Sequence, residues 1–250
     1  AAEGMKVEAA AYDTATGKLT ITFTLTDGAG AFDGILPYGS YTLTEIRTPD
    51  GYQFDSDSSY DLRNGFTFDI GDTGDGQTEW DLTNTGGKKS ALTNAPQIFR
   101  IKKTAEENGS GLAGVMFRIF EGGLTAEELE DAELVKTVTT AKAANEVDAY
   151  AEISMTGLKK DTVYTVTETA ALTGYEELEA PFYFMLVDDR EEGAETLLQL
   201  QLTDISGSSL TSSNGGKVTL IDESGEMVIQ AENTLETGSI TLSKDLIGDV

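Results

Sequence analysis

Two stretches of the chain place a glutamate on the apolar face of an expected strand: YTLTEIRTPDGY at 41–52 and YTVTETAALTGY at 164–175. Alternate residues of a strand face the same side of a sheet, and in both stretches the glutamate shares its parity with a tyrosine and an aliphatic residue. The residues on this face are Tyr41, Leu43 and Glu45 in the first stretch and Tyr164, Val166 and Glu168 in the second. Each carboxyl group is therefore expected to point into a core.

A lysine and an asparagine are expected to point inward by the same rule. The apolar residues of matching parity are Phe99 and Ile101 for Lys103, and Ile229 and Ala231 for Asn233. Burial of a lone ammonium or carboxylate costs several kcal/mol. Three such residues in one domain are therefore expected to share a site, in which Lys103 meets Glu168 and Asn233.

Placed together, these three residues could form an amide bond. Burial lowers the pKa of a lysine and raises that of a glutamate, so the neutral amine and the neutral acid both become accessible. The amine is then a nucleophile, and the acid can polarise the carboxamide oxygen and relay protons. Attack by the amine would expel ammonia and leave a Lys–Asn isopeptide bond. The alternative is a buried Lys–Glu ion pair with the asparagine capping a strand end.

The elements that must position these residues are short strands. Thr, Val, Ile, Tyr and Phe are plentiful, Gly numbers 27 and helical periodicity is nearly absent, which favours an all-β protein. Strands separated by turn signals are expected at 18–27, 65–70, 97–104, 114–120, 180–189, 197–205, 217–222, 226–233 and 238–245. One short helix is expected as an insertion at 125–135, because Thr125 and Glu128 make a capping box.

The chain also repeats itself, which predicts tandem domains. The segment LPYGSYTLTEIRTPDGY is matched by MTGLKKDTVYTVTETAALTGY, and SALTNAPQIFRIKKT is matched by IQAENTLETGSITLSKD. We expect a first domain at 1–96, a complete second domain at 97–236 and the first strand of a further domain at 237–250.

Composition excludes several classes of function. The chain has 250 residues and a net charge of −27, so nucleic acids and anionic membranes would be repelled. It contains no Cys and no His, which removes thiol catalysis, His-based triads, disulfides and most zinc or copper sites. No signal peptide or membrane span is visible.

The run Tyr-x-Leu-x-Glu-x-x-x-Pro-x-Gly-Tyr at 41–52 resembles the hallmark segment of the CnaB-type (collagen-adhesin B-region) domains of Gram-positive surface adhesins and pilins. LPYGSY just upstream and KTAEENGSGLAGVMFRI at 103–119 are similar to two further patterns of that family. The resemblance implies tandem Ig-like β-sandwich domains, here with one short helical insertion, that are stabilised by internal isopeptide bonds.

In the family, a first-strand lysine and a last-strand asparagine form the bond, and the hallmark glutamate catalyses it. By resemblance these roles belong to Lys103, Asn233 and Glu168 in the second domain. One position departs from the pattern: Leu172 stands where the first motif has Pro49, which is expected to loosen the turn after the strand.

In the first domain, Glu45 matches the hallmark glutamate. Its expected partner is Asn94, which precedes Lys103 by nine residues much as Asn233 precedes Lys244 by eleven. Asn84 has a similar parity and remains the alternative.

No lysine of the first domain matches the pattern. Lys6 and Lys18 belong to other strands, so the lysine-bearing strand is expected before residue 1. Lys244 is expected to serve a third domain. Alternatively it could reach the first domain of another copy, because an open sheet edge invites strand addition.

Two acidic segments resemble incomplete calcium loops. DSDSSYD at 55–61 and DIGDTGDG at 69–76 lack the full ligand set of such a loop, and we interpret both as solvated turns. We expect no metal and no cofactor.

These observations lead to one principal hypothesis and one alternative. The chain is expected to be a stalk region of an extracellular adhesin or pilus protein on a Gram-positive cell wall, with neighbouring domains or pilus subunits as partners. The alternative is a module that binds a host protein or glycan through insertions at 121–150 and 188–216. A turnover enzyme is not expected, since Glu45 and Glu168 lie in separate domains and self-crosslinking occurs once.

Overall fold

The computed structural model describes residues 2–26, 30–32, 36–55, 62–71, 94–188 and 197–242. The chain divides into two compact units. The first unit comprises Ala1–Ile46 and Phe54–Asn94, and the second comprises Arg47–Gln53 and Ala95–Val250. Strands dominate both units, so the all-β class predicted from the sequence is confirmed.

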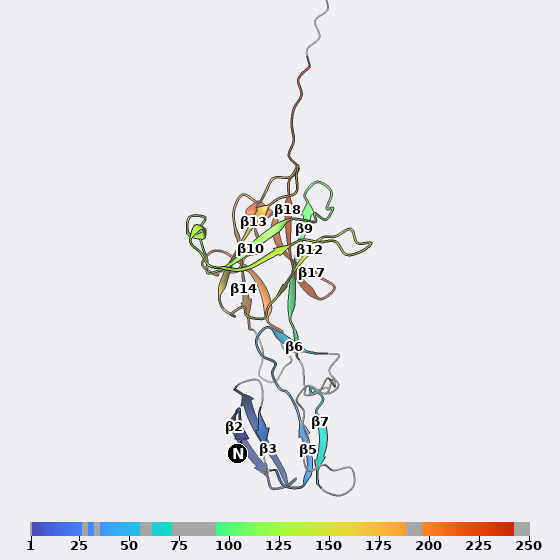
Figure 1. Ribbon diagram of the computed structural model, residues 1–250, viewed down its shortest axis with the longest axis vertical. Coiled ribbons are helices and arrows are strands. Elements are labelled where there is room, and N and C mark those ends of the chain that lie inside the picture. The colour runs from blue at the N-terminus through green and yellow to red at the C-terminus, as the bar shows by residue number, and fades with distance from the viewer. Residues whose placement is uncertain are drawn as a thin grey trace, which may run out of the picture. The chain divides into compact units, whose positions relative to one another are not determined.

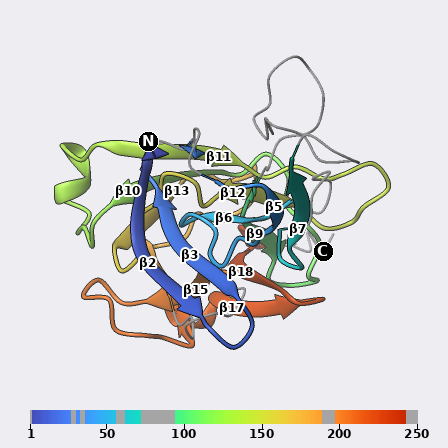
Figure 2. The same ribbon diagram turned by 90° about the horizontal axis from the view of Figure 1, so that it is seen from below.

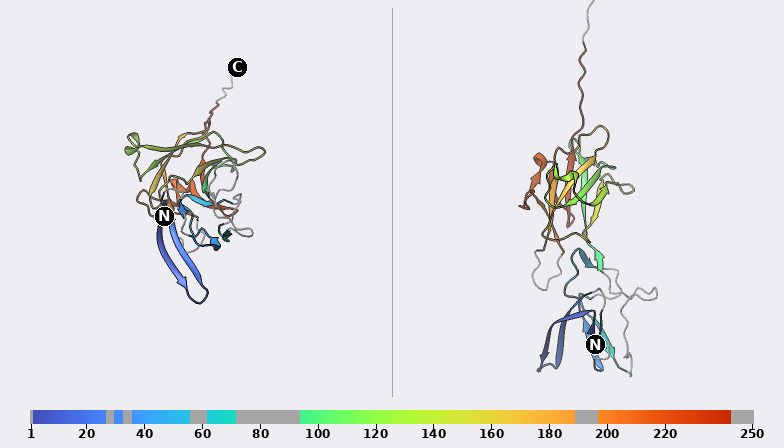
Figure 3. Two further views of the ribbon diagram at one scale, coloured as in Figure 1. Left: turned by 60° about the horizontal axis from the view of Figure 1, so that its bottom comes forward. Right: turned by 60° about the vertical axis from the view of Figure 1, so that its left-hand side comes forward.

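The second unit consists of two five-stranded sheets that pack face to face (Figures 1 and 3). The β13 sheet has the order β11 (Leu134–Thr139), β10 (Met116–Glu121), β13 (Val163–Ala170), β14 (Phe182–Val187) and β15 (Gln199–Thr203). The β9 sheet has the order β12 (Tyr150–Ser154), β9 (Ile98–Ala105), β18 (Glu226–Asn233), β17 (Val218–Glu223) and β16 (Ser212–Ser213). All strand pairs are antiparallel except β9 and β18, which lie side by side in parallel.

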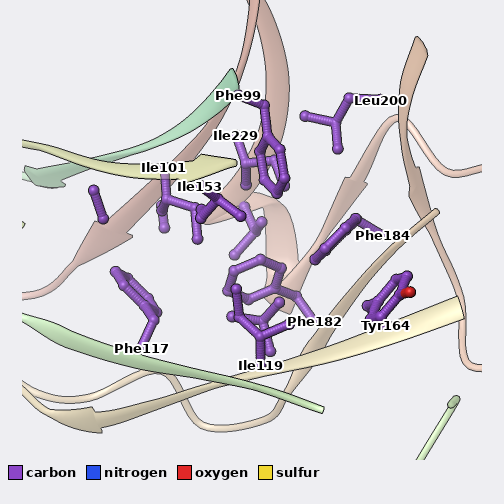
Figure 4. Close-up of a cluster of buried hydrophobic side chains, with 14 of the residues drawn as sticks. Phe99, Ile101, Phe117, Ile119, Ile153, Tyr164, Phe182, Phe184, Leu200 and Ile229 are labelled. Carbon is purple, nitrogen blue, oxygen red and sulfur yellow. The ribbon is translucent and has the colours of Figure 1, made fainter. Parts of the chain in front are cut away.

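The core of the second unit lies between the two sheets, where side chains from both inner faces point toward one another (Figure 4). Phe184 from the β13 sheet contacts Phe99 from the β9 sheet with ring centroids 5.0 Å apart. Tyr164 stacks on the same Phe184 ring at 5.2 Å. The strand periodicity of two therefore places one face of every long strand in this core.

Each unit has one strand that carries the hallmark segment, β5 (Gly39–Leu43) in the first unit and β13 in the second, and we call it the hallmark strand. A tyrosine near the start of each hallmark strand anchors the preceding loop. The Tyr164 hydroxyl accepts a hydrogen bond from the Lys159 backbone N–H at 2.6 Å. In the first unit, the Tyr41 hydroxyl donates to the Pro37 carbonyl at 2.7 Å. The geometry resembles the tyrosine corner of Ig-like sandwiches, in which a tyrosine hydroxyl bonds to backbone a few residues upstream.

The first unit is built from strand pairs, of which the β2–β3 hairpin is the longest (Figure 2). The pairs are β1 (Ala2–Glu3) with β4 (Ala31–Phe32), β2 (Met5–Asp13) with β3 (Lys18–Leu25), and β5 (Gly39–Leu43) with β7 (Phe66–Ile70). A further pair joins β6 (Tyr52–Phe54) to β8 (Asn94–Pro96), and most of its residues belong to the second unit. The Asp13 carboxylate closes the hairpin turn by accepting from the Ala15 N–H and the Thr16 hydroxyl.

The helix predicted at 125–135 is wrong. The capping box forms, since the Thr125 N–H donates to the Glu128 carboxylate at 2.8 Å, but only one 3₁₀ turn follows, η1 (Glu128–Glu130). No residue of this turn is buried. A helix this short is stable only when packing supports it, and the chain instead joins the β13 sheet from Leu134 onward.

Part of the segment expected as the first strand of a further domain, 238–245, is described by the structure. Residues 238–242 lie in no strand, and Ile240 and Leu242 are 82% and 84% exposed. A strand needs a neighbour to satisfy its backbone groups, and these residues have no sheet beside them.

Within the described residues, no helix is long and apolar enough to cross a membrane.

We predict that Tyr164→Phe lowers the free energy of unfolding of the second unit by roughly 1–2 kcal/mol, because it leaves the Lys159 N–H without its acceptor. Urea unfolding followed by circular dichroism measures the loss. Tyr175→Phe is the matched control, since its hydroxyl bonds to the exposed Glu107 and water can replace that contact. Equal effects of the two substitutions would contradict the anchoring role of Tyr164.

Candidate functional site

The parallel pairing of β9 and β18 brings Lys103 and Asn233 together. In this register Lys103 lies opposite Ala231, and Asn233 lies opposite Ala105. Both polar side chains are buried, as are Ala231 and the other inward residues of the two strands. The lysine and the asparagine are therefore diagonal neighbours on the inner face of one sheet, although they lie 130 residues apart in the chain.

Glu168 comes from the facing sheet. It lies on β13 opposite Phe117 of β10, and its inward direction follows the parity of Tyr164 and Val166, which are both buried. The Phe117 ring lies 5.8 Å from the Lys103 Nζ atom, where a cation–π contact stabilises an ammonium group. The site therefore bridges the two layers of the sandwich.

The three side chains are enclosed and hydrogen-bonded to one another. The side chains of Lys103 and Glu168 are wholly buried, and Asn233 is 1% exposed. Lys103 Nζ donates to Glu168 Oε2 at 3.1 Å and to Asn233 Oδ1. Asn233 Nδ2 donates to Glu168 Oε1 at 2.6 Å. Each carboxylate oxygen therefore faces one nitrogen of the lysine–asparagine pair.

This arrangement differs in one detail from the chemistry expected from the sequence. Glu168 accepts from the amide nitrogen of Asn233, and the lysine, rather than the acid, faces the carboxamide oxygen. An ionised carboxylate can only accept hydrogen bonds, so it takes donors from both partners.

Burial controls the charge of the lysine. It lowers the pKa of Lys103 from 10.5 to about 8, an effect that the neighbouring Glu168 carboxylate partly offsets. A neutral, nucleophilic amine is therefore easier to reach at this position than in an exposed lysine.

The turn after the hallmark strand keeps its form without proline. The Tyr175 N–H donates to the Leu172 carbonyl at 3.0 Å, just as the Tyr52 N–H donates to the Pro49 carbonyl at 3.0 Å. The third residue of each turn is a glycine at positive φ, as a type II turn requires. Leucine is compatible with this turn because its position precedes the two residues whose dihedral angles define the turn.

That turn supplies a contact that the sequence did not reveal. It leads the chain back over the site, where the Leu178 N–H donates to Glu168 Oε2 at 3.2 Å. The same loop bonds to the chain beyond β18, since the Glu176 N–H donates to the Thr234 carbonyl at 2.9 Å. No residue type marks a backbone donor, so neither contact has a signal in the sequence.

The first unit contains a related pair of groups. Asn94 Nδ2 donates to Glu45 Oε1 at 2.9 Å. Glu45 is half-buried, and burial raises its pKa while the Asn94 hydrogen bond opposes that rise. Asn84, the alternative partner, lies outside the described residues.

The lysines named from the sequence do not join this pair in the described part of the chain. Lys6 bonds to Glu8 on the exposed face of the β2–β3 hairpin at 3.0 Å. Lys18 is exposed at the first residue of β3. Lys244 lies outside the described residues.

The two candidate calcium segments lie largely outside the described residues as well. Among the residues that the structure does describe, no group of three or more Asp or Glu side chains is arranged to hold a metal ion.

The family model described as SpaA, prealbumin-like fold domain, matches the chain at residues 3–85 and again at 97–197. These matches cover well over half of the chain, and the chain therefore belongs to this family. Two consecutive matches fit the tandem arrangement, and they confirm the resemblance to CnaB-like domains of pilins and adhesins. A search of curated protein sequences finds no match.

Several solved structures are similar to the chain in fold. A C-terminal fragment of the pilus adhesin SpaC from Lactobacillus rhamnosus GG has 20% identity and a TM-score of 0.41, with 95% of this chain and 92% of that chain covered. The pilus adhesin SpaC in its open conformation has 20% identity and a TM-score of 0.39, with coverages of 96% and 30%. The Corynebacterium diphtheriae major pilin SpaA has 16% identity and a TM-score of 0.33, with coverages of 62% and 36%. The chain thus spans about a third of the length of these two longer proteins.

We predict that the buried ammonium destabilises the fold when its counter-charge is removed. Glu168→Gln should unfold more easily at pH 7 than Lys103→Met/Glu168→Gln, by about 3 kcal/mol, because only the single variant retains an uncompensated buried charge. Both variants lack the carboxylate, so the comparison isolates the lysine.

The difference in stability between these two variants should become smaller as the pH rises. The pKa of Lys103 falls from 10.5 to about 8 on folding, and loss of the Glu168 carboxylate, which raises this pKa, lowers it further. Between these values the unfolded state binds more protons, so the stability of Glu168→Gln should rise with pH. Urea unfolding at pH 7 and pH 10 tests this, and a gap that stays constant or widens would contradict it.

Proposed function

We propose that the second unit closes an isopeptide bond between Lys103 and Asn233, with Glu168 as the proton-transferring group, and that the chain is a structural segment of a pilus or surface adhesin. The observation that supports this proposal is the enclosure of the three side chains in mutual hydrogen-bonding contact. The reaction occurs once per chain, so the protein is not a turnover enzyme.

The contacts suggest an order for the steps. The neutral Lys103 amine attacks the side-chain carbonyl carbon of Asn233, and electrons move to Oδ1. Glu168 Oε2, 3.1 Å from the amine, takes the proton that the new amide nitrogen loses. The same carboxyl group delivers a proton to Nδ2, which lies 2.6 Å from Oε1. The C–Nδ2 bond breaks, ammonia leaves and Glu168 returns to its initial state. The reaction therefore consumes no cofactor.

The bond would join the first strand of the second unit to its last. Because β9 and β18 are parallel neighbours, tension that enters at the start of β9 and leaves beyond β18 would pass through the Lys103–Asn233 bond. The segment between these residues would then bear little of that tension. On the chain-entropy model for a crosslink, a loop of this length disfavours the unfolded state by up to ~5 kcal/mol.

The pair Glu45–Asn94 supplies the acid and the carboxamide for the same chemistry in the first unit. Its amine would come from a lysine on another segment or another chain, for which Lys244 remains the candidate from the sequence.

Family membership supports the wider role. A prealbumin-like domain of the SpaA family matches both units, and resemblance to CnaB-type domains implies an extracellular location on a Gram-positive cell wall. The partners would be neighbouring domains of the same surface protein or other pilus subunits.

We predict that the intact mass of the purified chain is one ammonia below the value calculated from the sequence. Glu168→Gln should restore the full mass, because the proton-transferring carboxyl group is lost. Mass spectrometry of the intact chain gives the result. A succinimide at an Asn–Gly pair also loses ammonia, so a tryptic peptide that joins the Lys103 and Asn233 segments is required as well. An unmodified wild-type mass would refute the proposed bond.

We predict that bond formation accelerates with pH up to about 8. The chain is isolated in denaturant before it has folded and is then diluted into buffers from pH 6 to pH 9. The fraction of neutral Lys103, whose pKa is about 8, rises about tenfold per pH unit below that value and then saturates. Acid-quenched samples analysed by intact mass give the rate. A rate that falls with rising pH would contradict the lysine as nucleophile.

A further inference from the structure

Three polar side chains outside the buried site meet at the ends of three adjacent strands. Glu106 follows the last residue of β9, Thr234 follows Asn233 at the end of β18, and Lys217 immediately precedes β17. The Thr234 hydroxyl donates to Glu106 Oε2 at 2.5 Å and accepts from Lys217 Nζ at 2.6 Å. The ammonium and the carboxylate are themselves 3.7 Å apart. One hydroxyl thus connects all three strands.

The backbone around this group is fixed as well. The Glu106 N–H donates to the Asn233 carbonyl at 2.9 Å, and the Glu232 N–H donates to the Lys217 carbonyl at 2.9 Å. Asn233 and the residue before it are therefore bonded through their backbone to the ends of the two neighbouring strands, and the clamp of Glu106, Thr234 and Lys217 covers the point where β18 ends.

We propose that Thr234 is a positioning residue for the crosslinking reaction, because its hydroxyl, held between Glu106 and Lys217, fixes the end of β18 against β9. This inference rests on the proposed Lys103–Asn233 bond and goes beyond the three reacting groups. Thr234 is the residue next to the reacting asparagine, so a shift of its backbone moves the carboxamide directly.

The physical reason is the demand that the reaction makes on geometry. The amine must approach the carbonyl carbon along a narrow path, and displacement of a reacting group by about 1 Å can reduce a rate by about 10²-fold. Asn233 is the last residue of its strand, and the chain beyond it leaves β9 and bonds through its backbone to the loop at 174–176. The two hydrogen bonds of the Thr234 hydroxyl are therefore the side-chain contacts that hold this point against the ends of β9 and β17.

The test compares rates of bond formation after dilution from denaturant. Thr234→Val keeps the shape of the side chain but removes both hydrogen bonds, and should form the bond about tenfold more slowly or worse. Thr234→Ser keeps the hydroxyl and should react at close to the wild-type rate. Thr137→Val, at an exposed position of β11 in the other sheet, is the matched control and should also react at the wild-type rate.

A second comparison distinguishes a positioning effect from a general loss of stability. It uses the Lys103→Met chain, which cannot form the bond. Thr234→Val in a Lys103→Met chain should unfold at nearly the same urea concentration as Lys103→Met alone, which supports a role in geometry. A large loss of stability there would overturn the proposal.

The remaining outcomes distinguish failure of the positioning role of Thr234 from failure of the proposed Lys103–Asn233 bond. A wild-type rate for Thr234→Val, or an equally slow Thr234→Ser, overturns the positioning role while the isopeptide bond stands. A wild-type chain that forms no bond overturns both.

Discussion

A charged group enclosed in the core is the constraint on which the second unit depends. Lys103 has no exposed surface, and its ammonium group is compensated only where Glu168 and Asn233 both reach it. The lysine and the asparagine come from one sheet and the glutamate from the other, so compensation requires that the two sheets close in one register. A slip of one residue in β9 would turn the ammonium outward and an exterior side chain inward. The site thus couples sheet packing to strand register.

In the proposed reaction, the same constraint is the source of the reactivity of the site. Enclosure disfavours the charge on Lys103 and moves its pKa toward neutrality, while the glutamate that stabilises the remaining charge also lies against the amide nitrogen of Asn233. An arrangement needed to compensate a buried ion pair is therefore also an arrangement for proton transfer between amine and amide. Burial and chemistry follow from one geometry.

The two hallmark segments show how local rules support that geometry. Tyr41 and Tyr164 each anchor the chain upstream of a hallmark strand, and each strand ends in a turn closed by the same backbone hydrogen bond. In the second unit this turn leads to Leu178, whose N–H completes the shell around Glu168. The loop is thus part of the site, although its side chains take no part in the chemistry.

The sequence by itself determined which side chains point inward, because the two-residue period of a strand is local: Lys103, Glu168 and Asn233 were identified from their parity with apolar neighbours. It also determined the β class and the tandem repeat. Only the tertiary structure decided that Lys103 and Asn233 are diagonal neighbours, because the pairing of strands 130 residues apart depends on how both sheets close. The tertiary structure also decided the clamp at Thr234 and the absence of a helix at 125–135. In both cases, contacts between segments distant in the sequence determine which hydrogen bonds and which short elements form.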